Sequence, residues 1–379
     1  MTRHLLHVFS TFGCGGPQVR TARIINALGS SFHHTIVATD GRFDAASLLS
    51  RSAPATCVEP PPGKGAVTYP LVLRKLLRRI APDLLITYNW GAIDAVVAAQ
   101  LGGGCPIVHT EDGFGPDESV GLKRRRVWTR RVALRGVTAT VVPSKTLRDI
   151  AVNTYWLRPG RVVYIPNGVD VLPFDSDARA AARASLGISD AEVVIGTVAS
   201  FRREKHLALL LEAFARLLDE RLRLVLVGDG PTSEELRARS HALGLGARVV
   251  FTGHREETAP LYRSFDVFAM SSITEQLPFT LLEAMAAGLP CVATDVGDCA
   301  HALGTNRAPE VIPPNAMEEY VRALETVCAS PSLRREIGVK NRERCVRLFS
   351  SDRMIAAYER IYSGGSFLHY PEQTYTLEA

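Results

Sequence analysis

The sequence predicts an α/β protein made of two doubly wound domains, each with a parallel sheet covered by helices on both faces. Short runs of apolar and β-branched residues alternate with helical stretches along the chain. This rhythm is typical of parallel sheets whose strands are buried on both sides. It occurs once in each half, and 379 residues exceed the roughly 150 residues of one ordinary domain.

The first half of the chain contains five predicted strands with helices between them. The strands are His4–Phe9, His34–Ala38, Leu84–Tyr88, Ile107–His109 and Thr138–Val142. The helices include Val19–Leu28, Leu71–Ile80 and Ala92–Leu101. Because each helix follows a strand and precedes another, crossover connections between parallel strands are expected.

The second half repeats the pattern. Its predicted strands are Val193–Val198, Leu222–Val227, Val249–Thr252, Val267–Met270 and Cys291–Thr294. Its predicted helices include Leu207–Leu218, Ser233–Leu243, Thr280–Ala287, Met317–Cys328 and Arg353–Tyr362. A linker is expected near Val171–Ser189, so we expect domains over residues 1–172 and 173–350. Residues 351–379 are expected to form a last helix, with a crossing back to the first domain as one option, and a loose tail.

Composition excludes several classes of protein. Hydrophobic residues make up 46% of the chain and charged residues 22%, which is ordinary for a globular protein and unlike a disordered, collagen-like or coiled-coil chain. No apolar run reaches the ~18 residues of a membrane helix, and the first strand is too short to be a secretory signal. The seven cysteines lie far apart without a C-x-x-C pair, which disfavours disulfides and zinc and suggests the cytoplasm.

Charge is distributed unevenly. Residues 1–175 hold 21 Lys/Arg and 12 Asp/Glu, whereas residues 176–379 hold 23 and 27. The basic excess lies mainly in Lys123–Arg126, Arg130–Arg135 and Arg74–Arg79. These residues are interpreted either as a solvated helix surface or as a contact with an anionic membrane, worth about 1 kcal/mol per basic residue. Nucleic acid is disfavoured because aromatic residues are not interleaved with the basic ones.

The strongest local signal is the segment DVFAMSSITEQLPFTLLEAMAAGLP. A strand is followed by a loop with Glu275 and by a helix that begins at Phe279. The backbone N–H groups of Phe279, Thr280 and Leu281 would then lack helical partners, so they favour a phosphate. Glu275 and Glu283 are carboxylates that could accept hydrogen bonds from a sugar and a ribose. The alternative is a helix-capping glutamate and an exposed one.

This segment resembles the signature of glycosyltransferase family 4, whose members are retaining enzymes of GT-B fold. The resemblance continues through the N-terminal glycine loop, VPSKTL, IPNGVD, FRREKH, LVGDGP and FTGH. It implies two Rossmann-like domains facing a deep cleft, with the acceptor bound by the first and the nucleotide-sugar by the second. It also implies that Glu275 contacts the donor sugar and that Glu283 holds the nucleotide ribose.

The FRREKH segment follows a predicted strand and opens a helix. Arg202 and Lys205 would neutralise the leaving diphosphate, which is electrostatic catalysis. The commoner family pattern, G-R-L-x-x-E-K, has an arginine where Ser200 stands, whereas Arg202 fits a pattern resembling S-L-R-P-E-K. Gly230 in LVGDGP would allow close approach of the nucleotide, although any strand-to-helix turn may use glycine.

Two features of the first domain match the family. Gly15 and Gly16, in STFGCGGPQVR, resemble the loop that approaches the donor phosphates and the acceptor. His109 stands where the family often has a histidine near the donor sugar, although a histidine at a strand end is commonly structural. In the HTEDGFGP loop that follows, Glu111 or Asp112 would position the acceptor hydroxyl. Arg20 is a further candidate for the cleft.

The resulting prediction is a metal-independent retaining glycosyltransferase without a cofactor. Its donor would be a UDP- or GDP-linked sugar, and its acceptor a glycan or lipid-linked glycan of exopolysaccharide or another surface polysaccharide. A D-x-D at Asp175–Asp177 lies in the linker and is not expected to bind metal, and Asp40 leaves an NAD site formally open. Competing functions are a non-catalytic sugar-nucleotide-binding subunit and a GT-B relative such as an epimerase. Expected partners include an anionic membrane but no nucleic acid, with a cytoplasmic location at the inner membrane face.

Overall fold

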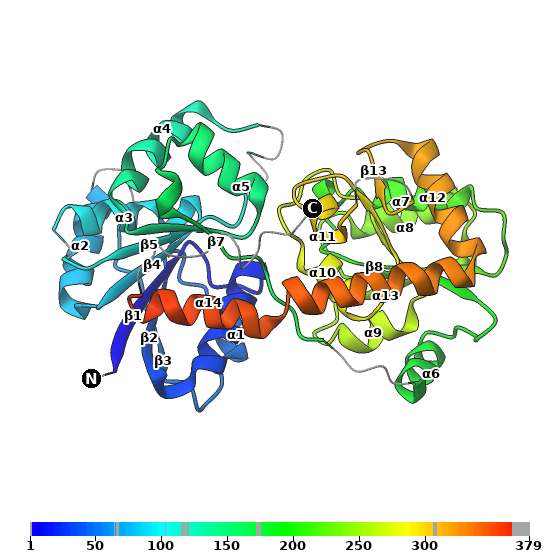
Figure 1. Ribbon diagram of the computed structural model, residues 1–379, viewed down its shortest axis with the longest axis horizontal. Coiled ribbons are helices and arrows are strands. Elements are labelled where there is room, and N and C mark those ends of the chain that lie inside the picture. The colour runs from blue at the N-terminus through cyan, green and yellow to red at the C-terminus, as the bar shows by residue number, and fades with distance from the viewer. Residues whose placement is uncertain are drawn as a thin grey trace. The chain divides into compact units, whose positions relative to one another are not determined.

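The computed structural model describes residues 2–63, 65, 68–102, 104–114, 118, 121–171, 176–305 and 309–365. It divides into two compact units (Figure 1). Unit 1 is Met1–Asn167 with Asp352–Ala379, and unit 2 is Gly168–Ser351. We expected the corresponding boundaries at 172/173 and 350/351. The chain therefore passes from unit 1 to unit 2 and returns near its C-terminal end.

Unit 1 is built on a seven-stranded parallel sheet with the order β3-β2-β1-β4-β5-β6-β7. The strands are β1 (Arg3–Phe9), β2 (Phe32–Ala38), β3 (Ala55–Val58), β4 (Leu84–Tyr88), β5 (Ile107–Thr110), β6 (Ala139–Val142) and β7 (Val162–Tyr164). All five strands expected from the sequence are present. The strand order reverses direction between β1 and β4, where Leu5 pairs with Leu84, and ligands of such sheets bind beyond the carboxyl ends of the strands.

Helices cover both faces of this sheet because successive residues of β1 point to opposite sides. Leu5 and Phe9 pack on the side of α1 and α14, and Leu6 and Val8 on the side of α2 and α3. Figure 1 shows α14 crossing in front of α1, and the Arg20 guanidinium of α1 lies 5.6 Å from the centre of the Tyr358 ring of α14. The helices are α1 (Gly16–Leu28), α2 (Thr68–Ile80), α3 (Ile93–Gln100), α4 (Arg124–Ala133), α5 (Lys145–Asp149) and α14 (Ser351–Tyr362).

Unit 2 has a six-stranded parallel sheet with the order β10-β9-β8-β11-β12-β13. The strands are β8 (Val193–Val198), β9 (Leu222–Val227), β10 (Val249–Gly253), β11 (Val267–Met270), β12 (Cys291–Thr294) and β13 (Val311–Ile312). The helices are α6 (Ser176–Ser185), α7 (Leu207–Ala215), α8 (Ser233–Ala242), α9 (Ala259–Ser264), α10 (Phe279–Ala286), α11 (Cys299–Leu303), α12 (Met317–Ala329) and α13 (Pro331–Leu348).

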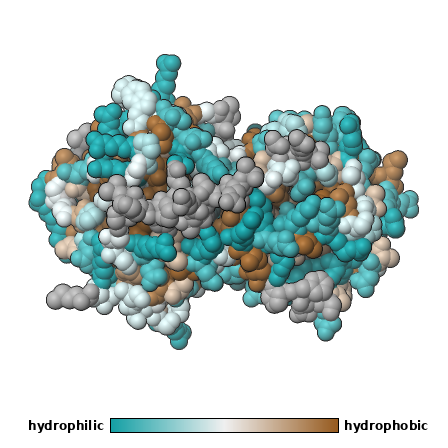
Figure 2. All heavy atoms as spheres, viewed as in Figure 1, coloured by the Kyte–Doolittle hydropathy of each residue, from teal (hydrophilic) through white to brown (hydrophobic). Residues whose placement is uncertain are grey.

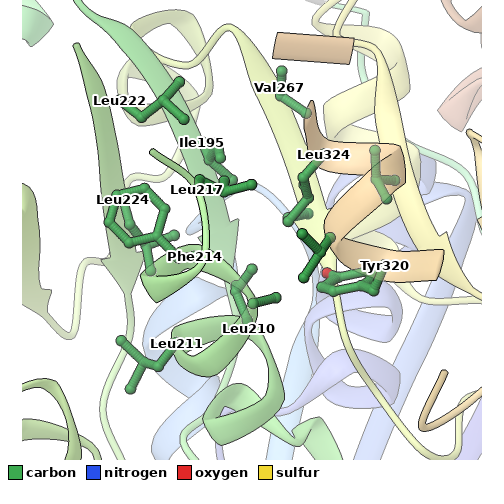
Figure 3. Close-up of a cluster of buried hydrophobic side chains, with 14 of the residues drawn as sticks. Ile195, Leu210, Leu211, Phe214, Leu217, Leu222, Leu224, Val267, Tyr320 and Leu324 are labelled. Atoms are coloured by element: carbon green, nitrogen blue, oxygen red, sulfur yellow. The ribbon is translucent and has the colours of Figure 1, made fainter. Parts of the chain in front are cut away.

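The core of unit 2 forms where α7 and α12 pack on one face of the sheet. Figure 3 shows Phe214 of α7 against Leu224 of β9, and Leu210 of α7 facing Tyr320 of α12, with Leu324 of α12 nearby. All are fully buried. Burial of each aliphatic side chain is worth about 1.5–3 kcal/mol, so this cluster holds α7, and the loop before it, firmly on the sheet.

Helices α7 and α13 differ from expectation. Helix α7 ends at Ala215 instead of Leu218, and the side chain of Leu218 is 90% exposed, so the apolar pattern overextended the helix. Helix α13 was not predicted because its sequence is rich in charged residues and only Ile337, Gly338, Asn341, Cys345 and Leu348 are buried. Its start carries an overlooked signal, since the Ser330 side chain accepts a hydrogen bond from Leu333 N and a proline follows.

Candidate active site

The carboxyl ends of β8 and β11 bring two predicted site residues together in unit 2. Lys205 Nζ lies 2.5 Å from Glu275 Oε1. Ser272 Oγ donates a hydrogen bond of 2.8 Å to the same oxygen. The side chain of Glu275 is only 12% exposed. The Lys205 ammonium and the Ser272 hydroxyl therefore hold its carboxylate in one place. This pairing gives the loop after β11 a fixed, polar surface.

Backbone contacts fix the two loops that carry this pair. Ile273 N donates to Glu204 O at 2.9 Å, and Ser271 Oγ donates to Lys205 O at 3.0 Å. On the other side of the same loop, a Cβ at Gly297 would collide with the carbonyl oxygen of Glu275. Gly297 therefore permits the close approach that positions Glu275, a requirement that was not recognised in the sequence.

Arg202 is placed differently from Lys205, although both belong to the same loop. Its side chain is 58% exposed and its Nη1 lies 4.0 Å from Glu204 Oε1. Exposed pairs at this distance contribute little. The structure thus brings Lys205 and Glu275 together and leaves Arg202 at the surface, so its role with a diphosphate stays a prediction.

Helix α10 begins at Phe279, as expected. Its N-cap is Pro278, and no side chain caps it. The first backbone N–H groups of a helix, here those of Phe279, Thr280 and Leu281, have no partners within the helix and attract anions together with its dipole. The helix start therefore has the chemistry expected of a phosphate site.

Glu283, one turn into α10, is half-buried and hydrogen-bonded. Its Oε2 accepts a bond of 2.8 Å from the hydroxyl of Tyr262 on α9. Burial and the nearby charge of Glu283 raise the pKa of Tyr262 well above its usual value, so the phenol keeps its proton and donates. Tyr262 was not predicted as a site residue, because nothing in a sequence marks a buried tyrosine as the partner of a glutamate on another helix.

Gly230 has a local role in packing. A Cβ at this position would lie 2.5 Å from Phe201 O. The loop after β9 is bonded to the loop after β8, since Phe201 N donates to Asp229 O at 2.9 Å and Thr232 N to Phe201 O at 3.0 Å. The close approach of Phe201 is by itself a sufficient reason for a glycine at position 230. A contact between Gly230 and a nucleotide stays a prediction.

In unit 1, Gly15 and Gly16 lie at the start of α1. The helix begins at Gly16, three residues before the expected Val19, with Gly15 as N-cap and Pro17 in the first turn. No side chain caps this end. The glycines therefore stand beyond the carboxyl end of β1 at a helix start, as the resemblance implies.

His109 is fully buried at the end of β5. Its Nδ1 lies 2.9 Å from Thr87 Oγ1, and its Nε2 lies 3.5 Å from Glu111 Oε2. Burial opposes ionisation of Glu111, but the hydrogen bond with His109 and the charge of Arg130 outweigh it and lower its pKa. His109 thus belongs to a buried polar network in this state, and its contact with a sugar stays a prediction.

The other acidic candidates of this loop are also internal. Arg130 Nε donates to Glu111 Oε2 at 3.0 Å, and Arg20 Nη1 lies 2.6 Å from Asp112 Oδ1, with the Arg20 and Asp112 side chains 2% and 6% exposed. We expected Arg20 in the cleft and the two acids at the acceptor, but these side chains form buried ion pairs. Residues 115–117 of the same loop, and Asp175 of the D-x-D, lie outside the described residues.

Within the described ranges, no group of three or more His, Cys, Asp or Glu side chains is placed to hold a metal ion. Nor does any helix in them have the length and apolarity to cross a membrane.

Two family models match consecutive parts of the chain. The model described as glycosyl transferases group 1 matches residues 178–344, and the glycosyl transferase 4-like domain matches residues 15–168. The chain belongs to glycosyltransferase family 4. Its signature residues Glu275 and Glu283 lie within the first of these matches.

Relatives and solved structures agree with this family. The chain is 36% identical over 170 residues to the putative glycosyltransferase EpsF of Bacillus subtilis, which is 44% of each chain. It is 26% identical over 240 residues to an Escherichia coli galactosyltransferase, UDP-Gal:alpha-D-GlcNAc-diphosphoundecaprenol alpha-1,3-galactosyltransferase, covering 59% of this chain and 60% of the other. The matches thus span about half the length of these curated relatives.

Among solved structures, HepE from Anabaena in complex with UDP matches with a TM-score of 0.83 and 18% identity, over 95% of this chain and all of the other. WaaG, a glycosyltransferase involved in lipopolysaccharide biosynthesis, matches with a TM-score of 0.75 and 18% identity, over 96% of this chain and 100% of the other. These similarities confirm the GT-B fold, with two Rossmann-like α/β domains.

Proposed function

We propose that this family 4 protein is a retaining glycosyltransferase that moves a sugar from a nucleotide-sugar to a glycan or lipid-linked glycan. The observation that carries the proposal is the arrangement of Lys205, Glu275 and the start of α10 at the carboxyl edge of the unit 2 sheet, with Glu283 further along the same helix. Cationic, anion-binding and hydroxyl-binding groups are what a nucleoside diphosphate sugar requires.

Each group has a proposed role. Lys205 holds the leaving diphosphate, because an ammonium has three donors and can retain Glu275 while it binds a phosphate oxygen. The N–H groups of Phe279, Thr280 and Leu281 bind the same diphosphate. Glu275 orients the sugar, and Glu283 accepts hydrogen bonds from the ribose. Charge that develops on the leaving phosphate is thus stabilised by preorganised groups.

The donor is proposed to be UDP-linked in preference to GDP-linked. The HepE structure contains UDP, and another structure of HepE contains UDP-glucose. The Escherichia coli relative is named for UDP-Gal. Unit 1 is proposed to receive the acceptor, with Gly15, Gly16 and His109 near the reacting groups. The names of EpsF and of the diphosphoundecaprenol enzyme support a surface polysaccharide acceptor carried on a lipid.

The basic and partly apolar surface of α4 also agrees with an acceptor that is carried on a membrane lipid. This helix has no acidic residue, and mostly hydrophilic side chains cover the top of unit 1 in Figure 2, where the helix lies. Trp128 and Val132 are 58% and 70% exposed among its arginines. We propose that this face contacts an anionic membrane, where indole rings and basic side chains are both favourable.

Aromatic residues are interleaved with the basic ones on this face, contrary to the expectation by which nucleic acid was disfavoured. Trp128 lies inside the basic run, and its ring stands 6.2 Å from that of Trp156. The membrane is preferred because Val132, an aliphatic residue without a stacking surface, is the most exposed apolar side chain of the helix.

A competing function is a subunit that binds the sugar nucleotide without turnover. The exposed position of Arg202, together with Ser200 in place of the commoner arginine, favours this alternative. Product analysis separates the two. Radiolabelled UDP-sugars incubated with the protein should give free sugar or a transferred product, and Glu275→Ala should lose this turnover. Glu212→Ala, at an exposed pair with Arg239, is the matched control and should retain it. Nucleotide binding without any turnover in the wild type would contradict catalysis.

A further inference from the structure

A cavity lies in unit 1, away from the carboxyl ends of its strands. Its volume is about 510 Å³, and its walls come from residues before β6 and β7 or at the start of β6. The lining residues are Leu134, Arg135, Thr140, Trp156, Leu157, Arg158 and Arg161. This is the amino-terminal edge of the sheet, so the cavity is separate from the region proposed for the acceptor.

The lining contains three arginines and no acidic residue. Arg161 is fixed at the wall, because its Nη1 donates to Arg135 O at 3.2 Å and to Val137 O at 3.3 Å. Arg135 and Arg158 are exposed. Uncompensated guanidinium groups around a concave surface favour an anion with several acceptor oxygens.

Thr140 adds a polar group that the protein itself does not satisfy. It is 1% exposed, and among the described residues its Oγ1 has no hydrogen-bond partner. Buried hydroxyls almost always have a partner. A hydroxyl left alone in the wall of a basic cavity is therefore best explained by a ligand that accepts or donates a hydrogen bond there.

Trp156 is the aromatic residue of the cavity lining, and its backbone has an energetically unfavourable conformation. Its φ is +57°, which a bulky residue rarely adopts, and its side chain is 53% exposed. The turn around it is tied by Tyr155 N to Ile150 O and Leu157 N to Ala151 O, both 3.0 Å. The Arg131 guanidinium stacks on the ring, 3.4 Å from its centre. Strain that keeps an indole at the surface points to a function for the ring.

We propose that this cavity binds the phosphate of an organic phosphate ester. Arg135, Arg158 and Arg161 hold the phosphate oxygens, Thr140 supplies a hydroxyl, and Trp156 packs against the organic part. The phosphate belongs to a lipid head group or to a free phosphate ester. The proposal is independent of glycosyl transfer, because none of the lining residues belongs to the proposed active site.

Tryptophan fluorescence of the full chain tests this site directly. Residues 90, 128 and 156 are the only tryptophans in the sequence, and all belong to unit 1. Every tryptophan signal therefore arises in unit 1. The two probes are sn-glycerol 1-phosphate in solution and vesicles of phosphatidylglycerol in phosphatidylcholine. The variant is Arg135→Ala with Arg158→Ala, and the control with equal charge loss is Arg42→Ala with Arg51→Ala, exposed residues of unit 1 outside both the cavity and α4.

We expect one of the probes to change the tryptophan emission of the wild type. The cavity variant should bind that probe about tenfold more weakly or worse, whereas the control variant should bind it as the wild type does. A response to glycerol phosphate identifies a free phosphate ester as ligand. A response to phosphatidylglycerol vesicles alone, weakened more by the cavity variant than by the control, identifies a lipid head group. Equal weakening by both variants, or no response to either probe, would overturn the proposal, because diffuse surface charge would then explain all binding.

Discussion

The hydroxyl of Tyr262 lies 2.8 Å from Oε2 of Glu283, so a buried phenol on α9 holds the carboxylate that we propose for the ribose. The same hydroxyl lies 3.2 Å from Thr280 O at the start of α10. The tyrosine thus contacts both the carboxylate and the helix start that are proposed to bind the nucleotide.

Tyr262→Phe should weaken UDP binding about three- to tenfold, because it removes one hydrogen bond that positions Glu283, worth roughly 0.5–1.5 kcal/mol. The ring packing against Phe265 and Phe268 remains, so thermal stability should change little. Calorimetry with UDP measures the effect, and pyrophosphate, which lacks a ribose, is the control ligand. Equal losses for UDP and pyrophosphate would indicate a general disturbance of the site instead of a positioning role.

Lys205→Ala should lower turnover of the UDP-sugar by about a hundred- to a thousandfold, as removal of a preorganised electrostatic group does in other enzymes. It also removes the partner of Glu275. Steady-state rates of sugar release measure the loss, and Arg203→Ala, at a cation two residues earlier in the same loop, is the matched control. A Lys205→Ala enzyme with the turnover of the wild type would exclude this lysine from leaving-group stabilisation.

Gly230→Ala should destabilise the fold, since its Cβ would lie 2.5 Å from Phe201 O. We expect a loss of about 1–3 kcal/mol in the free energy of unfolding, typical of overpacking. Urea unfolding measures it. Gly244→Ala is the comparison, because its Cβ would contact nothing within 4 Å and only its backbone angle opposes the change. Unchanged stability together with lost UDP binding would contradict this packing role and indicate that Gly230 contacts the nucleotide.

A buried histidine pair in unit 1 should make stability depend on pH. His7 Nδ1 lies 3.0 Å from Tyr88 Oη, and His7 Nε2 lies 3.0 Å from His34 Nδ1. Burial, with the nearby charge of His33, lowers the pKa of His34 from 6.5 to about 4, and burial lowers the pKa of His7 well below its usual value. Between about pH 6.5 and pH 4, these histidines therefore bind protons in the unfolded chain but stay neutral in the folded chain.

Stability is therefore fully present above about pH 6.5 and falls toward pH 4, by up to about 1.4 kcal/mol per pH unit for each histidine. Urea midpoints across this range test the slope. His34→Gln should flatten the dependence, and His241→Gln, at an exposed histidine, should leave it unchanged. Parallel pH profiles for the wild type and His34→Gln would show that this histidine contributes nothing to acid sensitivity.

The central strands and the helix carrying Glu283 could be predicted because apolar runs and helix-start signals are local properties. The edge strand β3 was missed because its four residues are half-exposed or exposed and carry no buried run. Helix α13 was missed because its few buried residues are scattered among charges.

Side-chain partners were beyond sequence reasoning where they depend on tertiary contacts. The pairing of Lys205 with Glu275 joins residues 70 positions apart, and the placement of Tyr262 depends on how α9 meets α10. The burial of His109, Glu111 and Asp112 was also unforeseen, because a polar loop after a strand is usually solvated and here two arginines neutralise its acids.

The most direct test of the account is calorimetric binding of UDP, GDP, ADP and CMP, with and without magnesium, to the wild type and to Glu283→Ala. We predict that UDP binds without magnesium and that Glu283→Ala weakens it by about ten- to a hundredfold, equal to roughly 1.5–3 kcal/mol. Unchanged UDP affinity in a folded Glu283→Ala protein would contradict the ribose assignment, and absence of binding by all four nucleotides would contradict the donor site.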